Sequence, residues 1–177
     1  FSENIDDPDS KLIKTGDSSI SFSGTNNSSG GILIEGGDLI IEKEESIGKG
    51  DISIQGSELT LSGSFDLGNN ISLENSSTIE VSGTTEIFGG LDGSGDLTLS
   101  GSGSINFTGE DEHSGTKNIQ GASVSVNNSS QSDFNLTSGT IKGAGTIKDL
   151  ITEGGFVQPG NSIGTLNLSG SYTETNE

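Results

Sequence analysis

The side chains best suited to acid–base or nucleophilic chemistry gather in one short segment. His113 is the one histidine in the sequence, and it directly follows Glu110, Asp111 and Glu112. A histidine activates a serine nucleophile when a carboxylate orients its ring. However, no nucleophile-elbow pattern accompanies His113, and residues 108–117 depart from any strand pattern. We therefore expect a solvent-exposed loop rather than a catalytic site, and we expect the chain not to be an enzyme.

A second acidic run, Glu42-Lys43-Glu44-Glu45, lies in the other long departure from strand pattern, residues 42–50. Paired carboxylates do acid–base work when their environments differ, and nothing in the sequence separates these three in that way. Loops on a rigid scaffold often carry recognition. The candidate contact residues are Glu42, Glu44, Glu45, Glu110, Asp111, Glu112 and His113.

Metal and cofactor sites are not predicted. Residues 93–97 contain a fragment of a calcium-binding glycine-rich repeat, but a calcium site needs six to eight oxygen ligands. The glycine-rich tract at 89–95 is followed by neither a helix nor a lysine, so it indicates turns rather than a phosphate loop. We expect no bound metal and no cofactor.

The charge of the chain is strongly one-sided. It has 26 acidic residues against seven lysines, no arginine, and a formal net charge of −19. Binding of nucleic acid relies on cationic side chains, so nucleic acid is not an expected partner. The acidity keeps a protein soluble and monomeric, and the absence of cysteine excludes a disulfide framework.

The elements that must position these residues are short strands. Only 27% of the residues are apolar, yet they occur in alternating clusters separated by Gly, Asn, Asp and Ser. Such alternation predicts strands, and the clusters recur about every 20 residues. Three series carry the period: Leu39, Leu59, Ile79 and then Leu97 after a shorter step; Ile34, Ile54 and Leu73; Ile105 and Val124.

These repeats predict an all-β fold, a right-handed parallel β-helix with roughly 20 residues per coil. We expect one segment over 1–177, with a lead-in or partial cap at 1–11. Residues 12–41 also align without a gap onto 97–126, an offset close to four coils. Phe65, Phe88, Phe107 and Phe134 occupy strand-like positions and are expected in the core.

Three sequence patterns resemble a known protein family. The run Pro159-Gly160-Asn161-Ser162-Ile163-Gly164-Thr165-Leu166, followed by Tyr172-Thr173, is similar to the PGNSIGTL signature of bacterial autotransporter passengers. Residues 12–31 resemble the autotransporter-associated β-strand repeat, and 101–126 look like a degraded copy. Residues 138–147 resemble the stretch that precedes the signature, so 138–173 form the motif region.

The resemblance implies a passenger segment of type V secretion, displayed on the bacterial surface and outer membrane or secreted. It implies export through the protein's own C-terminal outer-membrane β-barrel, outside this segment, and a role of Pro159–Leu166 in folding during export. A non-catalytic adhesion or host-interaction role is favoured, with a host-cell protein or glycan as partner and with possible self-association. The alternative is a passive stalk that presents an upstream domain, and a polysaccharide-active enzyme is a remote third.

Overall fold

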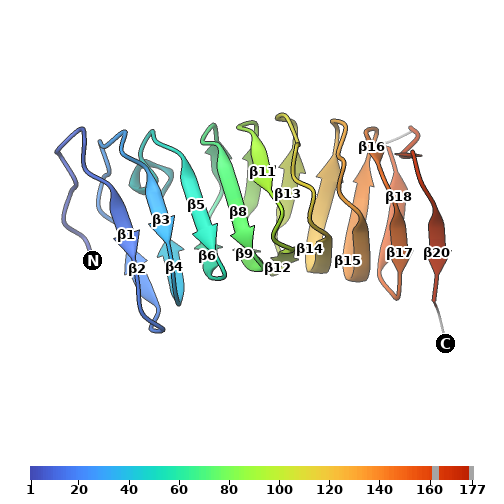
Figure 1. Cartoon of the computed structure of the whole chain (residues 1–177), viewed down its shortest axis with the longest axis horizontal. Coiled ribbons are helices and arrows are strands. Elements are labelled where there is room, and N and C mark those ends of the chain that lie inside the picture. Colours follow the sequence, from blue (N-terminus) through green and yellow to red (C-terminus); the bar gives the residue numbers. More distant parts are fainter. Residues whose placement is uncertain (161–163, 176–177) are drawn as a thin grey trace.

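The computed structural model describes residues 1–160 and 164–175, which form a parallel β-solenoid of about eight turns. The coils stack in sequence order along one axis, with the N- and C-terminal residues at opposite ends (Figure 1). The predicted all-β fold is confirmed. In the described part of the chain, the 3-10 turn η1 (Glu44–Ser46) is the one helical element.

The strands line up on three faces of the solenoid. The first face is the sheet of β1 (Leu12–Lys14), β3 (Ile32–Ile34), β5 (Ile52–Gln55), β8 (Ile71–Asn75) and β11 (Leu91–Gly93). The second face stacks β2 (Ile20–Phe22), β4 (Asp38–Ile41), β6 (Glu58–Leu61), β9 (Ser77–Val81), β12 (Leu97–Ser100), β14 (Lys117–Val126), β15 (Phe134–Gly143), β17 (Leu150–Thr152) and β20 (Tyr172–Glu174).

The third face stacks β7 (Phe65–Leu67), β10 (Thr84–Ile87) and β13 (Ser104–Phe107), continues in the second halves of β14 and β15, and reaches β18 (Phe156–Pro159). Beyond β11, single bridges extend the first face through Asp111 and Ser130. They lead to β16 (Thr146–Ile147), which pairs with β19 (Asn167–Leu168).

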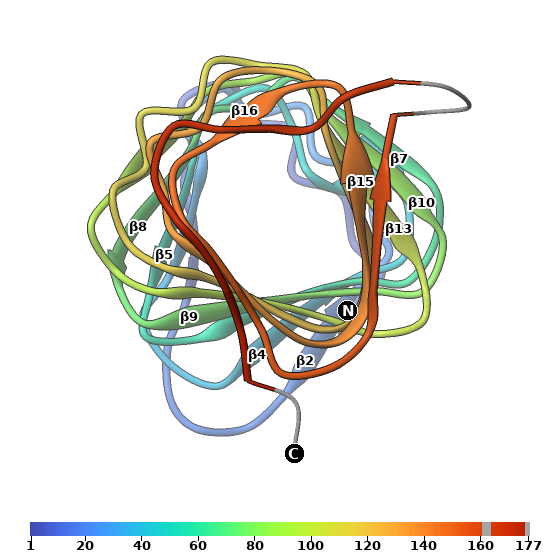
Figure 2. The same cartoon turned by 90° about the vertical axis from the view of Figure 1, so that its right-hand side faces the viewer.

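The solenoid is right-handed. Seen from the C-terminal end, the chain runs counterclockwise as it approaches the viewer (Figure 2). This is the hand that right-twisted strands impose on crossovers between parallel strands. The predicted handedness is therefore confirmed.

Cross-coil pairing confirms the period of about 20 residues. Leu39 pairs with Leu59 and Leu59 with Ile79. Ile79 then pairs with Leu99, not with Leu97, so the shorter step predicted there was wrong. The coil keeps its length at this point. Leu97 lies two residues before Leu99 in the same strand and also points inward.

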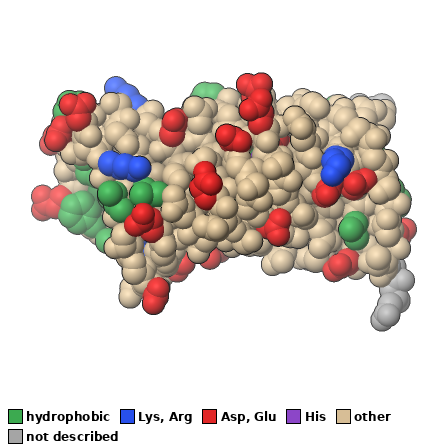
Figure 3. Space-filling view, in the orientation of Figure 1, with side chains coloured by type: hydrophobic (Ala, Val, Ile, Leu, Met, Phe, Trp, Pro, Cys, Tyr) green, Lys and Arg blue, Asp and Glu red, His purple; other side chains and the backbone are tan. Residues whose placement is uncertain are grey.

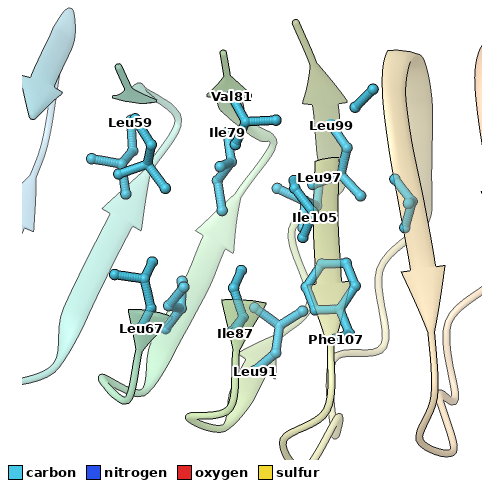
Figure 4. Packing of buried hydrophobic residues seen from close by; sticks show 14 of the residues in the cluster. Leu59, Leu67, Ile79, Val81, Ile87, Leu91, Leu97, Leu99, Ile105 and Phe107 are labelled. Carbon is cyan, nitrogen blue, oxygen red and sulfur yellow. The ribbon is translucent and has the colours of Figure 1, made fainter. Parts of the chain in front are cut away.

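Alternation within each short strand builds the core. Leu59, Ile79 and Leu99 are each 0% exposed and stack above one another in successive coils. Figure 4 shows these side chains pointing into the interior from neighbouring strands. Since successive residues of a strand point to opposite faces, three or four residues suffice to place two side chains inward.

Glycine permits the sharp corners between faces. Gly101, between β12 and β13, has a φ of +93°, a conformation that other residues rarely adopt. A Cβ atom on Gly101 would also lie 2.2 Å from the carbonyl oxygen of Val81 in the coil below. The corner therefore requires glycine for both its backbone angle and its close approach.

The longer sequence repeat does not coincide with whole coils. Leu12 lies in β1 on the first face, whereas its counterpart Leu97 begins β12 on the second face. The two residues are 85 positions apart, which exceeds four coils of about 20 residues. The expectation that the alignment of residues 12–41 onto 97–126 spans whole coils was therefore wrong. The two segments share a pattern of strands and turns, but they do not occupy equivalent positions in the solenoid.

The two ends of the described stack differ. At the N-terminal end, Ile5 bridges to Asn26 and the ring of Phe1 packs 5.4 Å from that of Phe22. At the C-terminal end, Val157 and Tyr172 occupy inward columns but are 38% and 54% exposed, because no described coil covers them.

Candidate functional site: an exposed groove and a buried polar cluster

Residues 42–50, here named the excursion, leave the strand pattern as the sequence predicts. Glu42, Glu44 and Glu45 are exposed, whereas Ser46 and Ile47 turn inward and are buried. The Ser46 hydroxyl donates a hydrogen bond of 2.6 Å to the carbonyl oxygen of Gly24 in the preceding coil. The excursion is therefore anchored by two inward residues and presents its carboxylates to solvent.

Side chains replace the backbone ladder where the excursion interrupts the third face. The backbone N–H of Asp66 in β7 donates to the Glu44 carboxylate, with an N···O distance of 3.2 Å. The Nδ2 of Asn26, a buried residue, donates to the carbonyl oxygen of Ile47 over 3.2 Å. A backbone group withdrawn from water needs a partner, and these side chains supply partners that a strand would otherwise provide.

Asn69 holds the far end of the excursion. Its Nδ2 donates to the carbonyl oxygens of Gly48 and Gly50, at 3.2 and 2.8 Å. One side chain thus binds two backbone positions of the neighbouring coil. Asn26 and Asn69 together fix the excursion from both sides.

A groove of about 470 Å³ lies along the excursion and β7. Ile47 and Leu67 contribute buried apolar side chains to it. Its polar lining consists of Thr25, Asn26, Asn27, Glu44, Glu45, Lys49, Asp66 and Asn69. Three carboxylates against one lysine make the lining acidic, in keeping with the excess of acidic side chains on the face seen in Figure 3.

Phe88 lies beside Gly68, a lining residue of this groove, instead of lying in the core. Its side chain is 53% exposed, whereas those of Phe65, Phe107 and Phe134 are buried as predicted. A Cβ atom on Gly68, which lines the groove, would lie 2.7 Å from Cε2 of the Phe88 ring. The prediction of a core position for Phe88 was wrong, because Ile87 takes the inward position and Phe88 follows it at the corner.

The predicted contact residues Glu110 and Glu112 are exposed. They line a second hollow of about 300 Å³ together with Asp51 and Asp92 on the first face. Four carboxylates lie around it without a basic residue in its lining. The 42–45 and 110–113 segments therefore contribute to two separate hollows.

Asp111 and His113 are not on the surface, so their prediction as exposed contact residues was wrong. Asp111 is 5% exposed and His113 is 0% exposed. Asp111 pairs with Leu91 below and Ser130 above, in the column that is apolar in the preceding coils. The segment thus keeps the alternation of a strand, with Glu110 and Glu112 outside and Asp111 and His113 inside.

Lys117 completes a buried polar cluster with these residues. Its Nζ lies 3.0 and 2.9 Å from the two carboxylate oxygens of Asp111. It also donates to the hydroxyls of Ser130 and Ser132, at 3.2 and 2.6 Å. The ring of Phe134 lies 5.3 Å from the ammonium nitrogen, within the range of a cation–π contact.

His113 connects the cluster to the backbone. Its Nε2 lies 2.7 Å from the carbonyl oxygen of Gly95 and its Nδ1 lies 2.9 Å from the Ser132 hydroxyl. A carbonyl oxygen can only accept, so Nε2 carries the proton that bonds Gly95. The Ser132 hydroxyl has one proton, and it donates to the backbone carbonyl oxygen of His113 over 2.8 Å, on the same side as Nδ1. Both ring nitrogens therefore lie within hydrogen-bond distance of a polar atom.

Burial lowers the pKa of His113, and the nearby positive charge of Lys117 lowers it further. Burial also lowers the pKa of Lys117, while the Asp111 carboxylate opposes that change. Both effects have the same cause, since a charge withdrawn from water is costly unless an opposite charge lies beside it.

The cluster contains the atoms of a nucleophile–base pair, because the Ser132 hydroxyl contacts both Lys117 and His113. All three side chains are 0% exposed, however, so a substrate in solution has no contact with them. The arrangement supports a structural role, in which each buried polar group satisfies another.

Periodicity could have revealed the buried cluster in the sequence. Lys117 pairs with Leu97, and Asp111 pairs with Leu91, each 20 positions earlier. Extending the inward columns by one coil would have placed both charges in the core. The signal that was missed is the register of these residues with the inward residues of the preceding coil. The high local density of charge was instead interpreted as a sign of exposure.

The residues of the autotransporter-like signature are described in part. Pro159 ends β18 and is exposed, and Gly160 is buried with its N–H 2.7 Å from the carbonyl oxygen of Gly143. Asn161, Ser162 and Ile163 lie outside the described residues. Gly164 and Thr165 are exposed, and Leu166, 7% exposed, joins the core.

Within residues 1–160 and 164–175, no three His, Cys, Asp or Glu side chains are grouped so as to hold a metal ion. The same residues contain no helix of the length and apolarity needed to cross a membrane. Fold and surface together define the chain as a parallel β-solenoid, an architecture compatible with an autotransporter passenger. Comparison with protein-family models, curated proteins and solved structures finds no match.

Proposed function

We propose that this chain is a surface-displayed or secreted segment of an autotransporter passenger, and that it acts as a non-catalytic adhesion module through the groove beside the excursion. The proposal joins two independent supports. One is the resemblance of Pro159–Leu166 and of residues 12–31 to autotransporter sequences. The other is the groove itself.

The observation that carries an adhesive role is the way the excursion is held. A passive spacer needs only regular coils, yet here the coil that contains β3 and β4 leaves the pattern and opens a groove of about 470 Å³. Glu44, Asn26 and Asn69 replace the interrupted ladder, so the groove has fixed walls. Preformed concave sites of about 300–1,000 Å³ on rigid scaffolds are typical of ligand binding.

Binding of the folded segment to host cells tests this role. We expect saturable binding of the fluorescently labelled protein, and no saturable binding after heat unfolding. Asp66→Lys, on the groove, should lower binding at least tenfold. Glu153→Lys makes the same charge change at an exposed position near the other end of the rod, and it should bind like the parent.

Two results would contradict the proposal. Absence of saturable binding by the folded protein would favour the stalk alternative, in which an upstream domain carries the activity. Equal loss in the Asp66→Lys and Glu153→Lys variants would indicate a general charge effect rather than a site at the groove.

A further inference from the structure

We propose that the groove binds a neutral or amino-sugar unit of a glycan, with the ring of Phe88 as its stacking surface. This inference deepens the adhesive role proposed above and rests on it. It follows from four features of the groove: an exposed aromatic ring, polar side chains without partners, the sign of the charge, and a covered strand edge.

The exposure of Phe88 has no explanation in the packing of the core. The side chain is 53% exposed, although an inward position lies one residue earlier in the same coil. Its ring rests against Gly68, where a side chain would collide with it. A half-exposed ring beside a lining residue of the groove offers a flat apolar surface, and the C–H groups of a pyranose pack on such surfaces.

The polar lining has unused hydrogen-bonding capacity. Among the described residues, the side chains of Glu45, Lys49 and Asp66 make no hydrogen bond or ion pair. Carboxylates accept hydrogen bonds at both oxygens and lysine donates up to three, so these groups suit the hydroxyls of a sugar. Ile47 and Leu67 provide the apolar part of the lining.

The charge of the lining selects among sugars. Glu44, Glu45 and Asp66 outnumber Lys49, and the whole chain carries −19. A sialic or uronic acid would be repelled by this field, whereas a neutral hexose is indifferent to it and a protonated amino sugar is attracted. Acidic glycans are therefore not the expected ligands.

A peptide strand fits the groove less well than a sugar. Peptides commonly add a strand to an exposed sheet edge, and β7 is the last strand of the third face on this side. However, the Glu44 carboxylate already accepts from the Asp66 N–H on that edge. A strand-forming peptide would have to displace this contact, whereas a sugar bound to side chains would not.

Binding to defined oligosaccharides tests the assignment. The probes are chitotriose, lactose and N-acetyllactosamine as neutral sugars, the chitosan trimer as amino sugar, and 3′-sialyllactose as acidic comparison. We expect calorimetry to detect at least one neutral or amino sugar, with 3′-sialyllactose at least tenfold weaker than lactose. Saturation-transfer NMR should place the sugar C–H groups against aromatic protons.

Variants locate the site. Phe88→Ala should weaken binding about tenfold or more, and Phe88→Tyr should retain it because the flat ring remains. Phe156→Ala removes another exposed phenylalanine, 67% exposed, and should bind like the parent. Circular dichroism melting checks that each variant is folded.

The outcomes separate this inference from the adhesive role. Binding to cells that depends on the groove, without binding to any of the four neutral and amino sugars, would overturn the glycan assignment and leave adhesion intact. Preference for 3′-sialyllactose, or undiminished binding by Phe88→Ala, would also overturn it. A cationic peptide that binds the groove and is released by added salt would identify the other class of partner.

Discussion

The excursion and the 110–117 segment start from similar acidic sequences, but all carboxylates of the excursion face solvent, whereas Asp111 of the second segment lies inside the solenoid. In the excursion, Glu44 and Glu45 point to solvent and line a groove. In the other segment the chain keeps its register, so Asp111 enters the core and meets Lys117 at 2.9 Å. The difference teaches that in a solenoid the register of the coil, more than local charge, decides which acidic residues are exposed.

The energetic consequences of the two arrangements differ as well. A surface carboxylate such as Glu45 contributes little to stability, because water solvates it well. The Asp111–Lys117 pair has lost that solvation and depends on its partners. Substitutions in the buried cluster should therefore have larger effects than substitutions in the groove.

The largest expected effect comes from breaking the buried pair. Asp111→Ala leaves the Lys117 ammonium without its counter-charge and should lower the free energy of unfolding by about 3–5 kcal/mol. Chemical denaturation followed by circular dichroism measures the change. Glu110→Ala, one residue away but exposed, should change the free energy by less than about 0.5 kcal/mol. Similar effects of the two substitutions would contradict the inward register of Asp111.

Joint replacement of the pair sharpens this prediction. Asp111→Leu combined with Lys117→Met removes both charges and keeps apolar volume, so the double variant should be much more stable than Asp111→Ala. Denaturation under the same conditions gives the comparison. A double variant as unstable as the single one would mean that the loss arises from packing rather than from an unpaired charge.

A smaller effect is expected from loosening the excursion. Asn69→Ala removes two hydrogen bonds to the backbone of residues 48 and 50 and should cost about 1–3 kcal/mol. Hydrogen–deuterium exchange should show faster exchange confined to residues 42–50. Asn118→Ala serves as control, because its side chain has no hydrogen-bond partner among the described residues. Unchanged exchange in the Asn69 variant would argue against its role as an anchor.

Acid should weaken the buried cluster through His113. The pKa of His113 is lower in the folded chain than its ordinary value near 6.5, so the unfolded chain takes up the proton first. The contribution of neutral His113 to the free energy of unfolding is complete above about pH 6.5. It is lost as the pH falls from there toward the pKa of His113 in the folded chain, by at most about 1.4 kcal/mol per pH unit. Asp96 and Asp111 favour the charged ring and moderate the effect, while Lys117 opposes it.

Denaturation at pH 7.5, 6.5 and 5.5 measures this dependence. His113→Gln cannot titrate in this range and should show a smaller slope than the parent. A parent with equal stability at all three pH values would show that His113 takes up its proton equally in the folded and unfolded chains.

The smallest effect on stability should come from Phe88. Phe88→Ala removes a half-exposed ring and should change the free energy of unfolding by less than about 0.5 kcal/mol, even though it weakens glycan binding. Thermal and chemical denaturation both test this expectation. A loss of 3 kcal/mol or more, as for a buried phenylalanine, would show that the ring packs in the core and does not serve the groove.

Particular residues show how far the sequence could be interpreted. The columns Leu39–Leu59–Ile79 and Ile34–Ile54–Leu73 were predictable, because an inward residue must recur once per coil. The excursion was predictable as an exposed acidic loop. The groove was not, because its walls come from three coils and its anchors, Asn26 and Asn69, resemble ordinary turn residues.

The sequence by itself determined the architecture. Alternation of apolar and polar residues sets the strands, glycine sets the corners, and a 20-residue period stacks the coils into a parallel solenoid. Tertiary structure decided which of the polar and aromatic side chains point into the core and which point to solvent. It turned Asp111, His113 and Lys117 inward and left Phe88 outward, because a shift of one residue along a strand moves a side chain from one side of the wall to the other. It also brought Glu44, Asp66 and Asn69 together, since coils adjacent in space are about 20 residues apart in the chain.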